Sequence, residues 1–163
     1  MKLYEVRATM HLPHPRSRVF PFFADPGNLE TLTPGWLHFH ILTPLPLPME
    51  PGAKIDYRLR VHGLPVRWRS EITVWEPPRR FVDEQRRGPY RLWHHEHTFE
   101  EEDGGSRVVD RVRYAVLGGA LVNRLLVAKD LAKVFAWRQE KLGEVFGCVP
   151  GQGDAVWIGP ATD

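Results

Sequence analysis

FVDEQRRGPYRLWHHEHTF, which occupies residues 81–99, predicts two β-strands joined by a turn at Gly88. Successive side chains of a strand point to opposite faces of a sheet. Alternation therefore groups two sets of side chains: Phe81, Asp83 and Gln85 on the first strand, and Trp93, His95, His97 and Phe99 on the second. An apolar face with a few aligned polar groups is typical of a ligand pocket.

Alternating runs elsewhere predict the other strands of the same sheet. They cover residues 3–11, 37–42, 54–61, 66–74 and 106–115. Two short helices are expected after the first strand, over residues 16–24 and residues 26–33, the second with Asp25 as its N-cap. The proline-rich residues 43–53 predict an extended loop, which is either a lid over the pocket or a rigid connector.

Residues 120–146 form the only long helical pattern, with one apolar stripe along it. A run of strands followed by one amphipathic helix indicates an α+β domain with a single antiparallel sheet. The helix should lie across the concave face of that sheet. We expect one domain over residues 1–146 and, because residues 147–163 are rich in Gly and Pro, a loosely ordered C-terminal tail.

Composition and hydropathy indicate the cellular compartment that we expect for the protein. The chain has 163 residues and one cysteine, Cys148, so an internal disulfide is excluded and a reducing, cytoplasmic location is expected. The first 15 residues contain no continuous apolar run, and no later run has membrane-spanning length. We therefore expect neither a signal peptide nor integral membrane association.

Nucleic-acid binding is disfavoured by the arrangement of the arginines. The net charge is only +2, and Trp68 alternates with Arg67 and Arg69, so aromatic and basic side chains lie on opposite faces. Glu71, Glu84 and Glu96 share the arginine face. Cross-strand ion pairs are the simpler interpretation of that face.

Several segments together resemble the START-like, or SRPBCC, superfamily, in particular the bacterial ligand-binding domains grouped with polyketide cyclases and lipid-transfer proteins. The segments are VFPFFADPGNLETLTPGWL (19–37), GAKIDYRL (52–59), PVRWRSEI (65–72), FVDEQRRGPYRLWHHEHTFEE (81–101), DGGSRVVDRVRY (103–114) and FAWRQEKL (135–142). The resemblance implies a helix-grip (Bet v 1/START-like) fold, in which a curved antiparallel sheet of about seven strands wraps a long C-terminal helix around a deep cavity. It specifies no catalytic motif.

Binding of a small hydrophobic ligand, lipid-like or aromatic and polyketide-type, for transport or sequestration, is the function that this resemblance implies. The expected binding residues are those that alternation and the helical stripe turn inward: Tyr57, Trp68, Ser70, Phe81, Asp83, Gln85, Trp93, His95, His97, Asp110, Tyr114, Phe135 and Gln139. We expect no nucleic-acid partner and no cofactor. The oligomeric state does not follow from the sequence.

The polar members of this set leave three hypotheses open. Asp83 and Asp110 should hydrogen-bond His95 or His97, because buried ionisable groups need partners. The four could form an internal network, contact a polar group of the ligand, or transfer protons as in a cyclase or aromatase. They are therefore the catalytic candidates, although no catalytic residue is assigned.

A metal-dependent enzyme is a third alternative, because His95 and His97 are spaced as in the first cupin motif. No histidine follows His97, so the second cupin motif is absent, and a long terminal helix is foreign to a jelly roll. Three protein ligands would require Asp83 or Asp110 as well. No metal ligand is therefore assigned from the sequence.

Overall fold

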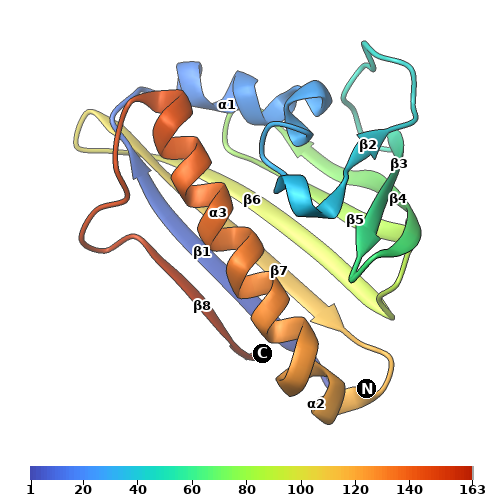
Figure 1. The fold of residues 1–163 in the computed structure, drawn as a ribbon. Coiled ribbons are helices and arrows are strands. Elements are labelled where there is room, and N and C mark those ends of the chain that lie inside the picture. Colours follow the sequence, from blue (N-terminus) through green and yellow to red (C-terminus); the bar gives the residue numbers. More distant parts are fainter. Residues whose placement is uncertain (163) are drawn as a thin grey trace.

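The computed structural model describes residues 1–162, and these residues form one curved antiparallel sheet with helices on its concave side (Figure 1). The strand order is β2-β3-β4-β5-β6-β7-β1-β8. The strands are β1 (Tyr4–Leu12), β2 (His40–Ile41), β3 (Lys54–Val61), β4 (Leu64–Glu76), β5 (Arg80–Arg87), β6 (Leu92–Glu102), β7 (Gly105–Ala115) and β8 (Ala155–Pro160).

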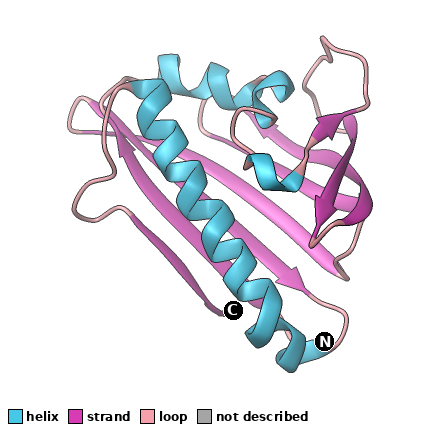
Figure 2. Cartoon of the chain, viewed as in Figure 1, coloured by secondary structure: helices cyan, strands magenta, loops and turns pink. Residues whose placement is uncertain are grey.

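The helices form two groups, coloured cyan in Figure 2. Between β1 and β2 lie α1 (Arg16–Ala24) and two 3₁₀ turns, η1 (Pro26–Leu29) and η2 (Gly35–Leu37). After β7 the chain continues through α2 (Gly119–Val122), the π-helical turn η3 (Asn123–Val127) and α3 (Ala128–Phe146). The predicted helix-grip fold is confirmed, with a long C-terminal helix lying along the sheet.

Local sequence explains where the elements turn and stop. Two hairpins close on residue pairs with positive φ: His62 and Gly63 at 49° and 78°, and Asp103 and Gly104 at 49° and 77°. Two consecutive positive φ angles define the type I′ turn, whose twist matches that of the flanking strands. Helix α3 ends at Gly147, which adopts the left-handed conformation at φ 73°.

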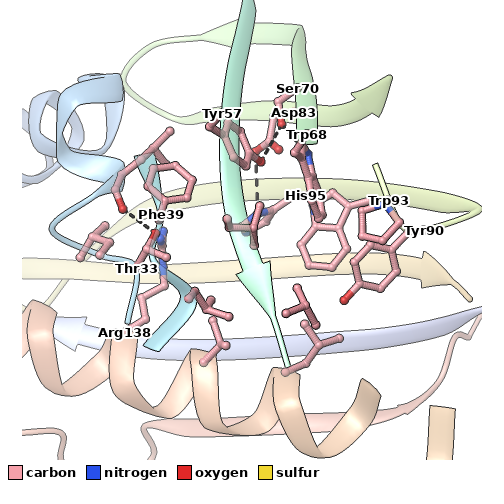
Figure 3. Close-up of a pocket in the computed structure, with 18 of the residues that line it drawn as sticks. Thr33, Phe39, Tyr57, Trp68, Ser70, Asp83, Tyr90, Trp93, His95 and Arg138 are labelled. Carbon is pink, nitrogen blue, oxygen red and sulfur yellow. Dashed lines mark hydrogen bonds and ion pairs between the residues drawn. The ribbon is translucent and has the colours of Figure 1, made fainter. Parts of the chain in front are cut away.

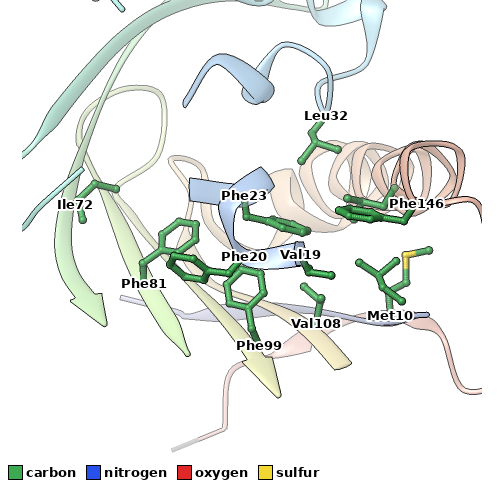
Figure 4. Packing of buried hydrophobic residues seen from close by; sticks show 12 residues of the cluster. Met10, Val19, Phe20, Phe23, Leu32, Ile72, Phe81, Phe99, Val108 and Phe146 are labelled. Carbon is green, nitrogen blue, oxygen red and sulfur yellow. The ribbon is translucent and has the colours of Figure 1, made fainter. Parts of the chain in front are cut away.

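The buried apolar side chains form two clusters. The first joins α1, β6 and the end of α3 through Phe20, Phe23, Phe99 and Phe146 (Figure 4). The second joins β1, β7 and α3 and contains Tyr4, Val6, Ala8, Val112, Tyr114, Val116, Leu131 and Phe135. Since α3 packs on β1 and β8, the curved strands β3 to β5 are left without direct cover from it.

The structure corrects the expected C-terminal tail. Residues 155–160, which were predicted to be loosely ordered with the rest of residues 147–163, form β8 and pair along β1 from Tyr4↔Pro160 to Thr9↔Ala155. Alternation in AVWIG is too short a pattern to stand out among glycines and prolines. An available edge of β1 provides the hydrogen bonds that define this strand.

Two elements are shorter than predicted. The expected strand over residues 37–42 is reduced to β2, because His38 takes a left-handed conformation at φ 46° and breaks the extended run. The expected helix over residues 26–33 is only the 3₁₀ turn η1, although Asp25 accepts a hydrogen bond from the Gly27 amide as its N-cap. The predicted ion pairs of the arginine face are confirmed, for example between Arg80 and Glu96 at 2.6 Å.

Within residues 1–162, none of the helices combines the length and apolar character needed to cross a membrane.

Prediction for β8: hydrogen exchange measured by mass spectrometry should show slower exchange in peptides spanning residues 155–160 than in peptides spanning residues 147–153. Ladder hydrogen bonds to β1 protect the first segment, whereas the second is turn and coil. The two segments serve as each other's control in one experiment. Equally fast exchange in both would contradict the eighth strand.

Candidate functional site

A cavity of about 630 Å³ lies between the C-terminal helix and strands β3 to β6. Most of its walls are apolar. Representative lining side chains are Phe22, Leu29, Leu32, Trp36, Phe39, Met49, Ile55, Leu59, Ile72, Val116, Leu131 and Val134. The cavity therefore exists because α3 packs against the β1 side of the sheet, while the curved strands on the other side bend away from it.

Aromatic side chains form one part of the wall. Tyr57 stacks on Trp68 with ring centroids 5.8 Å apart, and Trp68 meets Trp93 edge to face at 5.2 Å. The Trp68 Nε1 group donates to Ser70 Oγ at 3.1 Å, and the Tyr57 hydroxyl lies 3.2 Å from the same oxygen (Figure 3). Burial raises the pKa of Tyr57 well above its ordinary value, so this hydroxyl stays protonated.

A cluster of charged side chains forms another part of the wall. Strand β6 lies between β5 and β7, with His95 opposite Asp83 on one side and His97 opposite Asp110 on the other. Alternation turns both histidines toward α3, so each imidazole lies between two carboxylates. The predicted pairing of Asp83 and Asp110 with these histidines is confirmed.

The imidazole nitrogens and carboxylate oxygens of the cluster lie close to one another. His95 Nε2 lies 3.0 Å from Asp110 Oδ1, and His97 Nε2 lies 2.9 Å from Asp83 Oδ2. The second nitrogens face the other carboxylates: His97 Nδ1 is 2.9 Å from Asp110 Oδ1, and His95 Nδ1 is 3.7 Å from Asp83 Oδ2. The imidazole rings stack on each other with centroids 3.7 Å apart.

Arg138 of α3 completes the cluster and was missed by the sequence analysis. Its Nε donates to Asp110 Oδ2 at 3.2 Å, and its Nη2 lies 3.5 Å from Asp110 Oδ1. The guanidinium carbon lies 5.4 Å from the centre of the Phe23 ring. A signal for it existed, because Arg138 follows Phe135 by three positions and therefore shares the inward face of the helix.

The pKa values of both carboxyl groups in the cluster lie below their ordinary values. Burial alone would raise the pKa of Asp110, but the Arg138 guanidinium and the two histidines hold it well below its ordinary value. Burial likewise opposes ionisation of Asp83, yet the hydrogen bond from His97 and the charges around it lower its pKa. Both groups are therefore carboxylates at neutral pH.

The two histidines shift in opposite directions. Burial and the charge of His97 lower the pKa of His95, and its contacts with Asp110 and Asp83 offset this only in part. Burial also opposes protonation of His97, but Asp110 and Asp83 outweigh it and raise the pKa. These shifts favour the protonated form of His97, beside the two carboxylates and Arg138, and the neutral form of His95.

The structure separates the predicted binding residues into two groups. Those that line the cavity are Tyr57, Trp68, Ser70, Phe81, Asp83, Trp93, His95 and His97. The others are absent from its lining: Gln85, Asp110, Tyr114, Phe135 and Gln139. The cavity offers these five residues no direct contact, and their expected role in ligand binding stays a prediction.

Contacts elsewhere explain these five positions. Asp110 is buried behind the histidines, and Gln85 donates to the Tyr90 carbonyl. Tyr114 donates to Asn123 Oδ1, and Gln139 donates to the Thr9 carbonyl. Phe135 belongs to the second apolar cluster. These inward side chains of β7 and α3 pack where the helix contacts the sheet directly, and so they do not reach the cavity. Alternation alone does not show which inward side chains lie under the helix and which line the cavity.

Further cavity residues come from segments outside the predicted set. Phe39 packs against Tyr57 with the rings tilted by 47° and their centroids 4.7 Å apart, and Trp36, Tyr90 and Met49 also line the cavity. Met49 belongs to the proline-rich loop, so this loop contributes to the wall. Its role as lid or connector stays a prediction.

Asp83, His95 and His97 also present one potential metal-ligand atom each, and these three atoms lie within 4.8 Å of one another.

The comparisons with known proteins agree with this geometry. Residues 12–140 match the family model described as polyketide cyclase / dehydrase and lipid transport. A search of curated proteins gives no match.

Solved structures with the same fold come from Thermus thermophilus, Panax ginseng and Corynebacterium glutamicum. TTHA0849 from Thermus thermophilus is 23% identical with a TM-score of 0.66, covering 86% of this chain and 94% of that one. Major latex-like protein 151 from Panax ginseng is 8% identical with a TM-score of 0.67, covering 90% and 99%. A nucleoside-diphosphate sugar epimerase from Corynebacterium glutamicum is 25% identical with a TM-score of 0.60, covering 85% of this chain but 28% of that one.

Prediction for Arg138: Arg138→Met should lower the free energy of unfolding by about 3–5 kcal/mol, because it leaves the buried Asp110 carboxylate without its guanidinium partner. Urea unfolding at neutral pH measures the loss. Arg107→Met is the control, since the Arg107 and Glu100 side chains are 39% and 64% exposed and such a pair contributes about 1 kcal/mol or less. Equal losses in the two variants would contradict a compensated buried cluster.

Prediction for the histidines: in an NMR titration of the ring nitrogens, His97 should titrate above 6.5 and His95 below it. The raised pKa of His97 means that its protonation stabilises the fold below pH 6.5, and this contribution is lost as the pH rises through the folded-state value. The lowered pKa of His95 works oppositely, so stability is lost as the pH falls below 6.5. Titration of both rings on the same side of 6.5 would contradict the assignment.

Proposed function

The chain belongs to the polyketide cyclase / dehydrase and lipid transport family of START-like proteins, and from this membership we propose that it binds a small, largely hydrophobic ligand with one polar group. The ligand occupies the cavity between α3 and strands β3 to β6. Its apolar body packs against the aromatic wall, and its polar group meets the charged cluster. Transport or sequestration of such a molecule is the proposed biological use.

The cavity itself carries this proposal. A volume of about 630 Å³ lies within the range of small-molecule sites, which are mostly apolar and contain a few placed polar groups. An apolar space of this size would cost stability if it served packing alone. A ligand that fills this space would contact β3 to β5 where α3 does not.

The kind of wall favours an aromatic or polyketide-type ligand over a simple acyl chain. Tyr57, Trp68 and Trp93 present flat faces and edges, which suit offset stacking and edge-to-face contact with a ring. Asp83 and His95 line the same cavity and together can accept and donate hydrogen bonds. A hydroxyl, phenol or enol on a ring system matches both features.

Acid-base catalysis of the cyclase or aromatase kind is the second candidate. The observation that favours it is the His95 imidazole, which lines the cavity while its Nε2 lies 3.0 Å from Asp110. A neutral imidazole oriented by a carboxylate is suited to removing a proton from a bound ligand. The two functions share one site and differ in whether the ligand leaves chemically changed.

Prediction for the cavity: the neutral aromatic probe N-phenyl-1-naphthylamine should bind with enhanced fluorescence, and Val134→Trp should weaken this binding at least about tenfold. Val134 lines the cavity, so an indole at this position fills the space that the probe needs. The titration is run with a chelator in the buffer.

Ala136→Trp is the matched control, because Ala136 lies on the exposed side of the same helix and does not line the cavity. It should change the affinity less than about twofold. Probe binding that is absent from the unmodified protein, or unaffected by Val134→Trp, would overturn the proposal.

A further inference from the structure

We propose that Asp83, His95 and His97 form a site for one divalent transition-metal ion of the zinc class on the wall of the cavity. Their potential ligand atoms lie within 4.8 Å of one another. Two imidazoles and a carboxylate form the protein ligand set of many open metal sites, in which a further position is left for water or substrate. This site goes beyond binding of an apolar ligand and does not depend on it.

The donor atoms of the three side chains face one another. His97 Nε2 lies 2.9 Å and His95 Nδ1 lies 3.7 Å from the same atom, Asp83 Oδ2. Ligand atoms of a tetrahedral ion with bonds of about 2.0–2.2 Å are separated by about 3.3 Å. Small side-chain rotations therefore replace the contacts to Asp83 with bonds to a shared ion.

Asp110 has the position of a supporting carboxylate behind the ligands. The other nitrogens, His95 Nε2 and His97 Nδ1, lie 3.0 Å and 2.9 Å from Asp110 Oδ1. A carboxylate that holds the far nitrogen of a metal-binding histidine fixes its tautomer and orientation. Arg138 anchors Asp110 from α3, and Asp110 does not line the cavity, so it is a positioning residue and not a ligand.

His97 contains an atom whose bonding is incomplete. Its Nδ1 is buried and has no aligned hydrogen bond among residues 1–162, although Asp110 Oδ1 is only 2.9 Å away. The contact is close, but its angles are poor for a hydrogen bond. A rotation of the ring that brings Nε2 onto a metal ion can also align Nδ1 with Asp110.

Charge in the cluster is suited to a cation. An imidazole must be neutral to bind a metal ion through its ring nitrogen, so His97 releases any proton it holds there when the ion binds. The carboxylates of Asp83 and Asp110 and the guanidinium of Arg138 then leave one negative charge uncompensated. A divalent ion reverses this to one positive charge. The open coordination position, which faces the cavity, is then suited to an anionic oxygen such as hydroxide or the carboxylate or enolate of a ligand.

Cobalt(II) is the probe for this site, because its visible absorption reports coordination by nitrogen and oxygen and its paramagnetism shifts nearby protons. Protein without an affinity tag is stripped with a chelator, exchanged into chelator-free buffer and titrated. We expect one Co²⁺ per chain, with hyperfine-shifted imidazole protons from two histidines. The absence of bound Co²⁺ or of these shifts in the unmodified protein would overturn the proposal without any variant.

Three variants locate the ion. His97→Gln should abolish the Co²⁺ absorption, and Asp110→Asn should weaken binding about 10–100-fold, as expected for a supporting carboxylate. His94→Gln is the matched control, because His94 is adjacent on β6 but points to the opposite face of the sheet. Near-ultraviolet circular dichroism confirms that each variant is folded. Equal loss with His94→Gln, or none with His97→Gln, would refute the site.

Binding of N-phenyl-1-naphthylamine is measured with chelator present, so failure of the metal proposal leaves the proposed hydrophobic site intact. Conversely, Co²⁺ binding by a protein that does not take up the probe would support the metal site and remove the apolar one. The two proposals are therefore tested separately.

Discussion

Two carboxylates, Asp83 and Asp110, lie inside the domain beneath an amphipathic helix, and the arrangement around them depends on compensating their charge. Burial of an unpaired carboxylate is too costly for a domain of marginal stability. Compensation comes from both layers of the fold: two histidines on the strand between the carboxylates, and Arg138 on α3. A shift of β6 by one residue would turn the histidines to the outer face, leaving Asp83 without its histidine partners and Asp110 with Arg138 alone.

The same contact fixes where the helix lies. Arg138 holds α3 to Asp110 of β7, and Gln139, one residue later, donates to the Thr9 carbonyl of β1. These bonds place the helix over one side of a sheet that curves away on the other. The cavity follows from this asymmetry, so one set of polar contacts stabilises the domain and creates space for a ligand.

Much of this could be predicted from the sequence, because alternation and helical periodicity report which side chains face inward. The pairing of His95 and His97 with Asp83 and Asp110 followed from alternation and the need of buried charges for partners. Alternation gives direction but not distance, so it could not tell that Tyr114 lies under the helix while Trp93 lines the cavity. That division depends on the curvature of the sheet and the position of α3, which are properties of the whole fold.

Other features lay outside the reach of local patterns. β8 depends on an edge of β1 left open by the sheet, a long-range pairing with little signal in AVWIG itself. Arg138 was within reach, because a charged residue in an apolar helical stripe requires a buried partner, and Asp110 had no other source of a permanent positive charge. A polar residue on a predicted core face thus indicates where a site lies. In this fold, polar residues from β5, β6, β7 and α3 lie together in one cluster. Such clustering distinguishes a site from isolated buried polar groups, because an isolated group needs only a single local partner.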